Sequence, residues 1–156
     1  MQKLGERMNI FEIKDHNSLR LFFAENGLEV SNDIERDDGA IFSVIAQENN
    51  ATIAAATLSL RQGYYILDYI ATTPNSRRLG LGSELLETIV KKAKSLGAKS
   101  LYITARNPQF FKKHGFTKGQ PKNLDMNEGC IGCPQYNTTC VSVPMVLNLG
   151  ENYDQN

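Results

Sequence analysis

The sequence lacks the features that would assign it to a specialised class of protein. Its 156 residues contain no tryptophan, and no apolar run approaches the roughly 20 residues that span a bilayer. Basic and acidic side chains balance at 17 each, so no net charge draws the chain to nucleic acid or to an anionic membrane. We therefore expect neither nucleic acid nor membrane among its partners.

The sequence has few cysteines, and its first residues do not resemble a secretory signal. The first eight residues lack the apolar core of a secretory signal, so the default expectation is a cytoplasmic location. Stable disulfides are rare there, and the three cysteines are expected to stay reduced or to bind metal. The length favours one domain, predicted over residues 8–149 between a flexible extension (1–7) and a disordered tail (150–156).

Apolar periodicity predicts alternating strands and helices. Short turn-forming connectors join three consecutive strands, which favours an antiparallel meander, and an intervening helix favours a parallel pairing for the strand that follows it. The predicted elements are a strand at 10–14, a helix at 15–27, strands at 40–47, 51–60 and 64–72, a helix at 83–96, a strand at 100–105, a helix at 107–114, and strands at 116–118 and 140–149.

The strongest local pattern runs from Ile70 to Ser83. The stretch Ile-Ala-Thr-Thr-Pro-Asn-Ser-Arg-Arg-Leu-Gly-Leu-Gly-Ser predicts a buried strand that ends at Pro74, then a basic turn, then a helix entered through Gly80 and Gly82. A helix start offers main-chain N–H groups and a positive dipole end, which suit a phosphate. Glycine lets the backbone approach such an anion closely. The alternative is an ordinary helix entry with a Gly-Leu-Gly turn.

A second motif turns this pattern into a family resemblance. Arg77-x-x-Gly80-x-Gly82 is followed by Phe110-Phe-Lys-Lys-His-Gly-Phe116 in the expected order of elements. With both motifs, residues 8–149 resemble the GNAT superfamily of acetyl-CoA-dependent N-acetyltransferases. The resemblance implies an α/β fold, with a mostly antiparallel sheet that contains a splayed parallel strand pair and is flanked by helices. It also implies an acyltransferase that moves acetyl from acetyl-CoA to a primary amine, and we expect a monomer or homodimer.

The resemblance further implies how coenzyme A is held. Amides from Leu79 to Ser83 would bind the pyrophosphate, Arg77 and Arg78 would add charge, and the strand edge at 70–72 would pair with the pantetheine arm and donate to the thioester oxygen. The implied cofactor-binding residues are Ile70, Ala71, Thr72, Arg77, Arg78, Leu79, Gly80, Leu81, Gly82, Ser83, Thr104 and Phe111.

Candidate catalytic groups are fewer. Asp68 is the leading candidate for a general base, because a carboxylate in the middle of a central strand is out of place by propensity. The alternatives are an Asp68 bonded to a nearby hydroxyl or backbone group, and a water as base. Phe111 stands where many members carry a tyrosine that protonates the leaving sulfur. Tyr136 in the long loop 119–140, or water, could serve instead.

The stretch from Thr104 to Phe116 resembles a branch that contains bacterial N-acetylglutamate synthases, which implies a small amino-acid-like acceptor. Its carboxylates would need cations, and Arg61, Arg106 and Lys112 are candidates, although each could be a solvated surface charge. Two other functions remain open. One is a non-catalytic acyl-CoA-binding or metal- or redox-responsive module, and the other is a protein lysine or N-terminal acetyltransferase.

The cysteines form a C-x2-C-x6-C pattern. Cys130 and Cys133 have the spacing of a tetrahedral metal site, and Cys140 could add a third thiolate. His114 is the candidate fourth ligand, so a structural zinc is possible by this pattern. The alternative is three reduced thiols beside the acceptor site.

Overall fold

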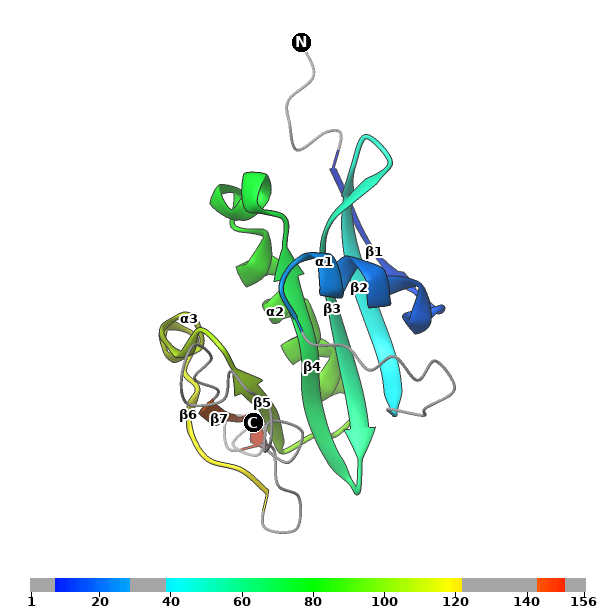
Figure 1. Cartoon of the computed structure of the whole chain (residues 1–156). Coiled ribbons are helices and arrows are strands. Elements are labelled where there is room, and N and C mark those ends of the chain that lie inside the picture. The colour runs from blue at the N-terminus through cyan, green and yellow to red at the C-terminus, as the bar shows by residue number, and fades with distance from the viewer. Residues whose placement is uncertain (1–7, 29–38, 122–142, 151–156) are drawn as a thin grey trace. The chain divides into compact units, whose positions relative to one another are not determined.

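The computed structural model describes residues 8–28, 39–121 and 143–150 (Figure 1). The chain divides into two compact units, each of which is built from two stretches of sequence. Unit 1 comprises Met1–Leu60 and Leu67–Lys92, and unit 2 comprises Arg61–Ile66 and Ala93–Asn156. The predicted extension 1–7, the predicted tail 150–156 apart from Gly150, and most of the loop 119–140 lie outside the described residues.

Seven strands form one mixed sheet with the order β1-β2-β3-β4-β5-β7-β6. The strands are β1 (Met8–Ile13), β2 (Ala40–Glu48), β3 (Ala51–Arg61), β4 (Tyr64–Thr72), β5 (Ser100–Ala105), β6 (Thr117–Lys118) and β7 (Val143–Asn148). One neighbouring pair, β4 with β5, is parallel. The predicted α/β fold with a mostly antiparallel sheet is thereby confirmed.

The strands of the predicted meander are β2, β3 and β4, which are consecutive in the sheet order. β2 pairs with β3 in antiparallel register, and β1 pairs with β2 in the same way. Asn49 and Asn50 have φ of 54° and 68°, and Gln62 and Gly63 have φ of 52° and 83°. Two consecutive residues with positive φ are the requirement of the tight hairpin turns that suit the twist of paired strands.

Helices cover both faces of these strands. β3 is buried from Ala54 to Ser59 without interruption, as expected for a strand with both faces covered. On one face, Leu19 and Phe23 form a cluster with Ile45 and Ala55. Figure 1 shows α1 (Arg20–Glu25) on this face and α2 (Leu81–Ser95) behind the strands.

The first predicted helix differs from the expected continuous one. It is divided into a 3-10 turn, η2 (His16–Leu19), and the short α1. In this turn the Ser18 amide and hydroxyl both donate to the Asp15 carbonyl, at 3.2 and 2.7 Å. Short polar side chains compete in this way with regular helix formation, and periodicity alone does not reveal it.

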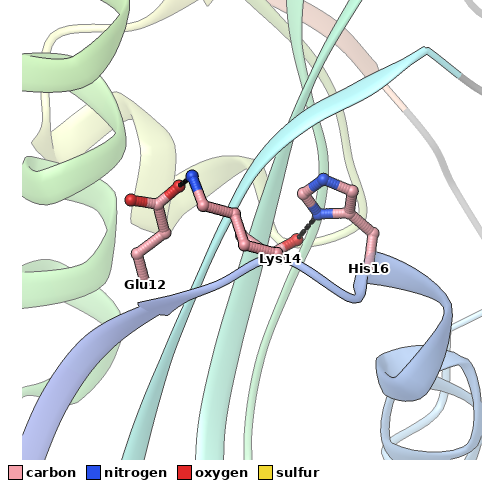
Figure 2. A network of polar contacts seen from close by, with 4 residues as sticks. Glu12, Lys14 and His16 are labelled. Atoms are coloured by element: carbon pink, nitrogen blue, oxygen red, sulfur yellow. Dashed lines mark hydrogen bonds and ion pairs between the residues drawn. The ribbon is translucent and has the colours of Figure 1, made fainter.

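The polar contacts around this turn also tie it to the sheet. His16 Nδ1 and Ser43 Oγ lie 2.6 Å apart, and Ser43 Oγ is 2.8 Å from Thr57 Oγ1. Nearby, Lys14 Nζ donates to Glu12 Oε2 at 2.8 Å (Figure 2). Ser43 and Thr57 are opposite each other in the β2–β3 register, so the hydrogen bonds run across the strands.

Unit 2 holds the parallel pairing and the end of the chain. Tyr65 is paired with Leu101 and Ile66 with Tyr102, which confirms the predicted parallel strands. β7 runs antiparallel to both β5 and β6. The helix predicted at 107–114 is present as α3 (Pro108–Lys113), which is followed by Gly115 with φ of 92°.

Candidate cofactor and catalytic site

The chain leaves β4 through a short helix instead of the predicted basic turn. Pro74–Leu79 form a 3-10 helix, η3. Thr73 precedes it in extended conformation, the Ser76 amide donates to the Thr73 carbonyl at 2.9 Å, and the two hydroxyls lie 3.0 Å apart. An extended threonine followed by proline at the first helical position is a helix-start signal that could have predicted η3.

Gly80 connects η3 to α2. Its φ of 73° and ψ of 17° lie in the left-handed region, where a side chain is costly. The Gly80 carbonyl accepts the Glu84 amide at 3.2 Å, so α2 begins at Leu81, two residues earlier than predicted. A Cβ added at Gly80 would meet no atom within 4 Å. The conformation, and not crowding, therefore requires glycine here.

The start of α2 has the properties expected of an anion site. The first main-chain N–H groups of any α-helix have no acceptor within the helix, and they carry the positive end of its dipole. Here this turn includes Leu81 and Gly82, and the exposed Gly80 immediately precedes it. The backbone of Arg77, Arg78 and Leu79 belongs to η3. Their contacts with a ligand stay predictions.

Asp68 has the hydroxyl partner that was one of the predicted alternatives. Ser59 Oγ donates to Asp68 Oδ2 at 2.5 Å; Ser59 is fully buried and Asp68 is half-buried. Such a bond is compatible with either a structural or a catalytic carboxylate. The role of Asp68 as a base stays a prediction.

The contacts of Asp68 and its neighbour reveal an irregularity in β4. Ala55 and Ser59 lie four residues apart on β3 and so share one face. Tyr69 packs against the cluster that contains Ala55, and Asp68 bonds Ser59. Consecutive residues of β4 thus both make contacts on the face of the sheet that α1 covers, which is the geometry of a β-bulge. Sequence patterning cannot detect this feature, because it presumes strict alternation.

The residues predicted to bind the thioester come directly after Asp68 and Tyr69 in the sequence of β4. Ile70, Ala71 and Thr72 are half-buried on the last part of β4, and the described register between β4 and β5 reaches only Ile66. Tyr69 stacks on Phe23 of α1, with ring centroids 4.8 Å apart and planes inclined by 22°. Unit 1 thus brings Asp68, residues 70–72 and the start of α2 onto one continuous stretch of β4, η3 and α2.

The other predicted site residues belong to unit 2. Thr104 is half-buried on β5 opposite Pro144. Phe111 is buried in an aromatic cluster, 5.0 Å from Phe110 and 5.5 Å from Phe116 between ring centroids. This packing gives Phe111 a role in the core of unit 2. Its predicted contact with the cofactor stays a prediction.

The metal prediction falls mostly on residues beyond the described ranges. Cys130, Cys133, Cys140 and Tyr136 lie there. His114 is described: it is exposed, and its ring lies 4.9 Å from that of Phe110. Over 8–28, 39–121 and 143–150, the structure holds no group of three or more His, Cys, Asp or Glu side chains that could bind a metal. Within these ranges no helix has the length and apolar character needed to cross a membrane.

Comparison with known proteins settles the family. The family model described as "Acetyltransferase (GNAT) family" matches residues 9–116, which is more than half of the chain. The chain belongs to the GNAT acetyltransferase family. Its mostly antiparallel sheet, its parallel β4–β5 pair and its helix after β4 agree with what the resemblance implied.

Individual relatives are more distant. An amino-acid acetyltransferase of Pseudomonas syringae pv. syringae is 34% identical over 86 residues, which are 54% of this chain and 19% of the relative. The chain therefore spans about a fifth of the length of this curated relative. The similarity covers only these 86 residues, so it does not show that this chain has the relative's activity.

Solved structures show the fold at low identity. A GNAT family acetyltransferase from Elizabethkingia anophelis with acetyl-CoA bound matches with a TM-score of 0.67 at 18% identity, covering 92% of this chain and 99% of its own. An N-acetylglutamate synthase from Neisseria gonorrhoeae, complexed with coenzyme A and N-acetyl-glutamate, matches with a TM-score of 0.67 at 19% identity, over 91% of this chain and 35% of its own.

Proposed function

We propose that this protein transfers an acetyl group from acetyl-CoA to the primary amine of a small amino-acid-like acceptor. The observation that carries the proposal is the left-handed Gly80, which ends η3 and opens α2 directly after β4. Family membership, a solved relative with acetyl-CoA bound and a curated relative named as an amino-acid acetyltransferase support it.

The pyrophosphate of coenzyme A fits the start of α2. The amides of Leu81 and Gly82 supply donors, the dipole of a 15-residue helix favours negative charge, and the open space at Gly80 leaves room for close approach. Arg77 and Arg78 precede this turn in sequence, and the family resemblance implies that they add positive charge to the site. These groups bind charge without contacting the acetyl end, so they orient the thioester from a distance.

The acetyl end would then lie along Ile70–Thr72. Pantetheine carries amide groups, which can pair with a strand edge as a further strand does. A main-chain N–H of this segment that points at the thioester oxygen would stabilise the negative charge that develops there during attack. This electrostatic contribution comes from the main chain and requires no particular side chain at these positions.

The chemistry also needs a neutral amine. An α-amino group has a pKa near 8, so about a tenth of it is neutral at pH 7. A lysine amine has a pKa near 10.4, so a much smaller fraction of it is neutral at that pH. Asp68 stands two residues before Ile70 and is our candidate to accept the ammonium proton. A thiol with a pKa near 8.5 leaves as thiolate with only about 2 kcal/mol against it at pH 7, so a dedicated acid is not essential.

The test is a direct assay of coenzyme A release. The protein is incubated with acetyl-CoA and a panel of amino acids, polyamines and short peptides, and free thiol is measured over time. We expect turnover with an amino acid and little with peptides. Release with peptides alone would favour a protein acetyltransferase, and tight acetyl-CoA binding without release on any acceptor would favour a non-catalytic binding module.

A further inference from the structure

Buried hydroxyls gather on the face of the sheet that α1 covers. Ser43 and Ser59 are completely buried and Thr57 is 4% exposed. Thr57 and Ser59 lie two residues apart on β3 and so face the same side, and Ser43 is opposite Thr57. A buried hydroxyl costs free energy unless it is hydrogen-bonded, so the partners of these groups define their roles.

The three hydroxyls fall into two sets. Ser43 joins His16 and Thr57, and this set ties the η2 turn to β2 and β3. Ser59 instead donates to a carboxylate oxygen, Oδ2 of Asp68, at 2.5 Å. Ser43 and Ser59 are equally buried on neighbouring strands but have different hydrogen-bond partners: Ser59 bonds the candidate base, and Ser43 bonds His16 and Thr57.

The surroundings of Asp68 restrict its movement further. The next residue, Tyr69, is stacked on Phe23, and the bulge turns both Asp68 and Tyr69 toward the same face of β3. The Asp68 backbone is therefore held on one side by packing. The Ser59 hydrogen bond then holds one oxygen of the carboxylate, Oδ2.

We propose that Ser59 is a positioning residue for proton removal by Asp68, an inference that rests on the proposed acetyl transfer. The acceptor ammonium gives one proton to Asp68, and its nitrogen lone pair forms a bond to the thioester carbon. The C–S bond breaks, and the surplus proton on nitrogen passes to the leaving sulfur. The proton on Asp68 then returns to solvent. Ser59 keeps its own proton throughout and holds Asp68 Oδ2.

A double-mutant cycle tests this role. Ser59→Ala, Asp68→Asn, the double variant and the control Ser43→Ala are compared in kcat, in KM for the acceptor and in Kd for acetyl-CoA. We expect Asp68→Asn to lower kcat on the order of 100-fold and Ser59→Ala roughly tenfold, with the acetyl-CoA Kd unchanged. Ser59→Ala should not lower kcat further in the Asp68→Asn protein, because its effect on the rate depends on the Asp68 carboxylate. Ser43→Ala should stay within about twofold of wild type.

Conservative variants keep the test decisive if Ser59→Ala folds poorly. Ser59→Thr retains a hydroxyl and should restore most of the rate, and Ser59→Cys, a weaker donor, should give an intermediate rate. Equal kcat in Ser59→Ala and Ser43→Ala, or a full further loss in the double variant, would overturn the positioning role alone. A folded wild-type protein that releases no coenzyme A with any acceptor would overturn the proposed function, and this inference with it.

Discussion

At the scale of single residues, the structure explains several positions by their immediate partners. Asp68 was conspicuous in the sequence as a carboxylate in a central strand, and both a catalytic role and a hydroxyl partner were foreseen. The identity of that partner could not be predicted. It depends on the β3–β4 register and on the bulge at Asp68 and Tyr69, neither of which leaves a local signal.

Glu12 offers a prediction that concerns pH. The hydrogen bond from Lys14 holds the pKa of the Glu12 carboxyl below its ordinary value (Figure 2), with further lowering by the charges of Lys14, Lys92 and His16. Because the folded-state pKa is depressed, the interaction contributes above the ordinary pKa and is lost as the pH falls through the lowered one.

Lys14→Met should therefore raise the pKa of Glu12 toward its ordinary value. The measurement is an NMR titration of the Glu12 side-chain carboxyl in both proteins. Lys113→Met, which removes an exposed lysine from α3 in unit 2, serves as control and should leave the Glu12 curve in place. Coincident curves for wild type and Lys14→Met would contradict the assigned cause.

At the scale of elements, apolar periodicity predicted the long, regular strands and helices. The strands and α2 have long alternating or amphipathic patterns, and their positions agree within a few residues with the structure. Periodicity did not separate η2 from the predicted helix at 15–27, and η3 was predicted as a turn, because short 3-10 segments have no long repeating pattern. The early start of α2 was missed because a left-handed Gly80 can precede a helix as well as occupy a turn.

Helix ends give a second prediction. Gly97 and Gly115 both follow helices with left-handed φ, of 89° and 92°, but a Cβ at Gly97 would meet nothing within 4 Å, while one at Gly115 would lie 3.3 Å from Leu147 Cδ1. Alanine at either position is strained by about 1–2 kcal/mol. Gly115→Ala should lose more stability than Gly97→Ala, because it adds crowding to the same strain.

Equilibrium urea unfolding of the two variants measures this difference. We expect both midpoints to fall, with the lower midpoint for Gly115→Ala. Asparagine tolerates the left-handed region, so Gly97→Asn should recover part of the loss. Equal midpoints for the two alanine variants would mean that the Leu147 side chain moves away from the new Cβ with no loss of stability.

At the scale of the whole molecule, the sequence predicted fold class and family from two motifs and an order of elements. The sheet order was less accessible. β7 lies between β5 and β6, so strands that are distant in sequence are paired, and such pairing has no local signature. The acceptor is the least predictable feature, because it depends on side chains that differ among members of one fold.

Cofactor binding should be visible as a change in global stability. A ligand that binds only the folded state stabilises it by about 2.7 kcal/mol at a concentration 100 times its Kd. Acetyl-CoA should therefore raise the thermal midpoint in a concentration-dependent way. Acetyl-pantetheine, which lacks the diphosphate, should raise the thermal midpoint much less. An equal rise with both ligands would contradict an anion site for the diphosphate.

The central claim is that main-chain groups at the start of α2 bind the diphosphate of coenzyme A. Calorimetric titration of coenzyme A into wild type, Gly80→Ala and Gly97→Ala tests it most directly. Both substitutions place a side chain on a left-handed residue with open space around it, at opposite ends of the same helix. We predict that Gly80→Ala weakens binding roughly tenfold or more, equal to about 1.4 kcal/mol, while Gly97→Ala retains wild-type affinity. Wild-type affinity in a folded Gly80→Ala protein would contradict the claim.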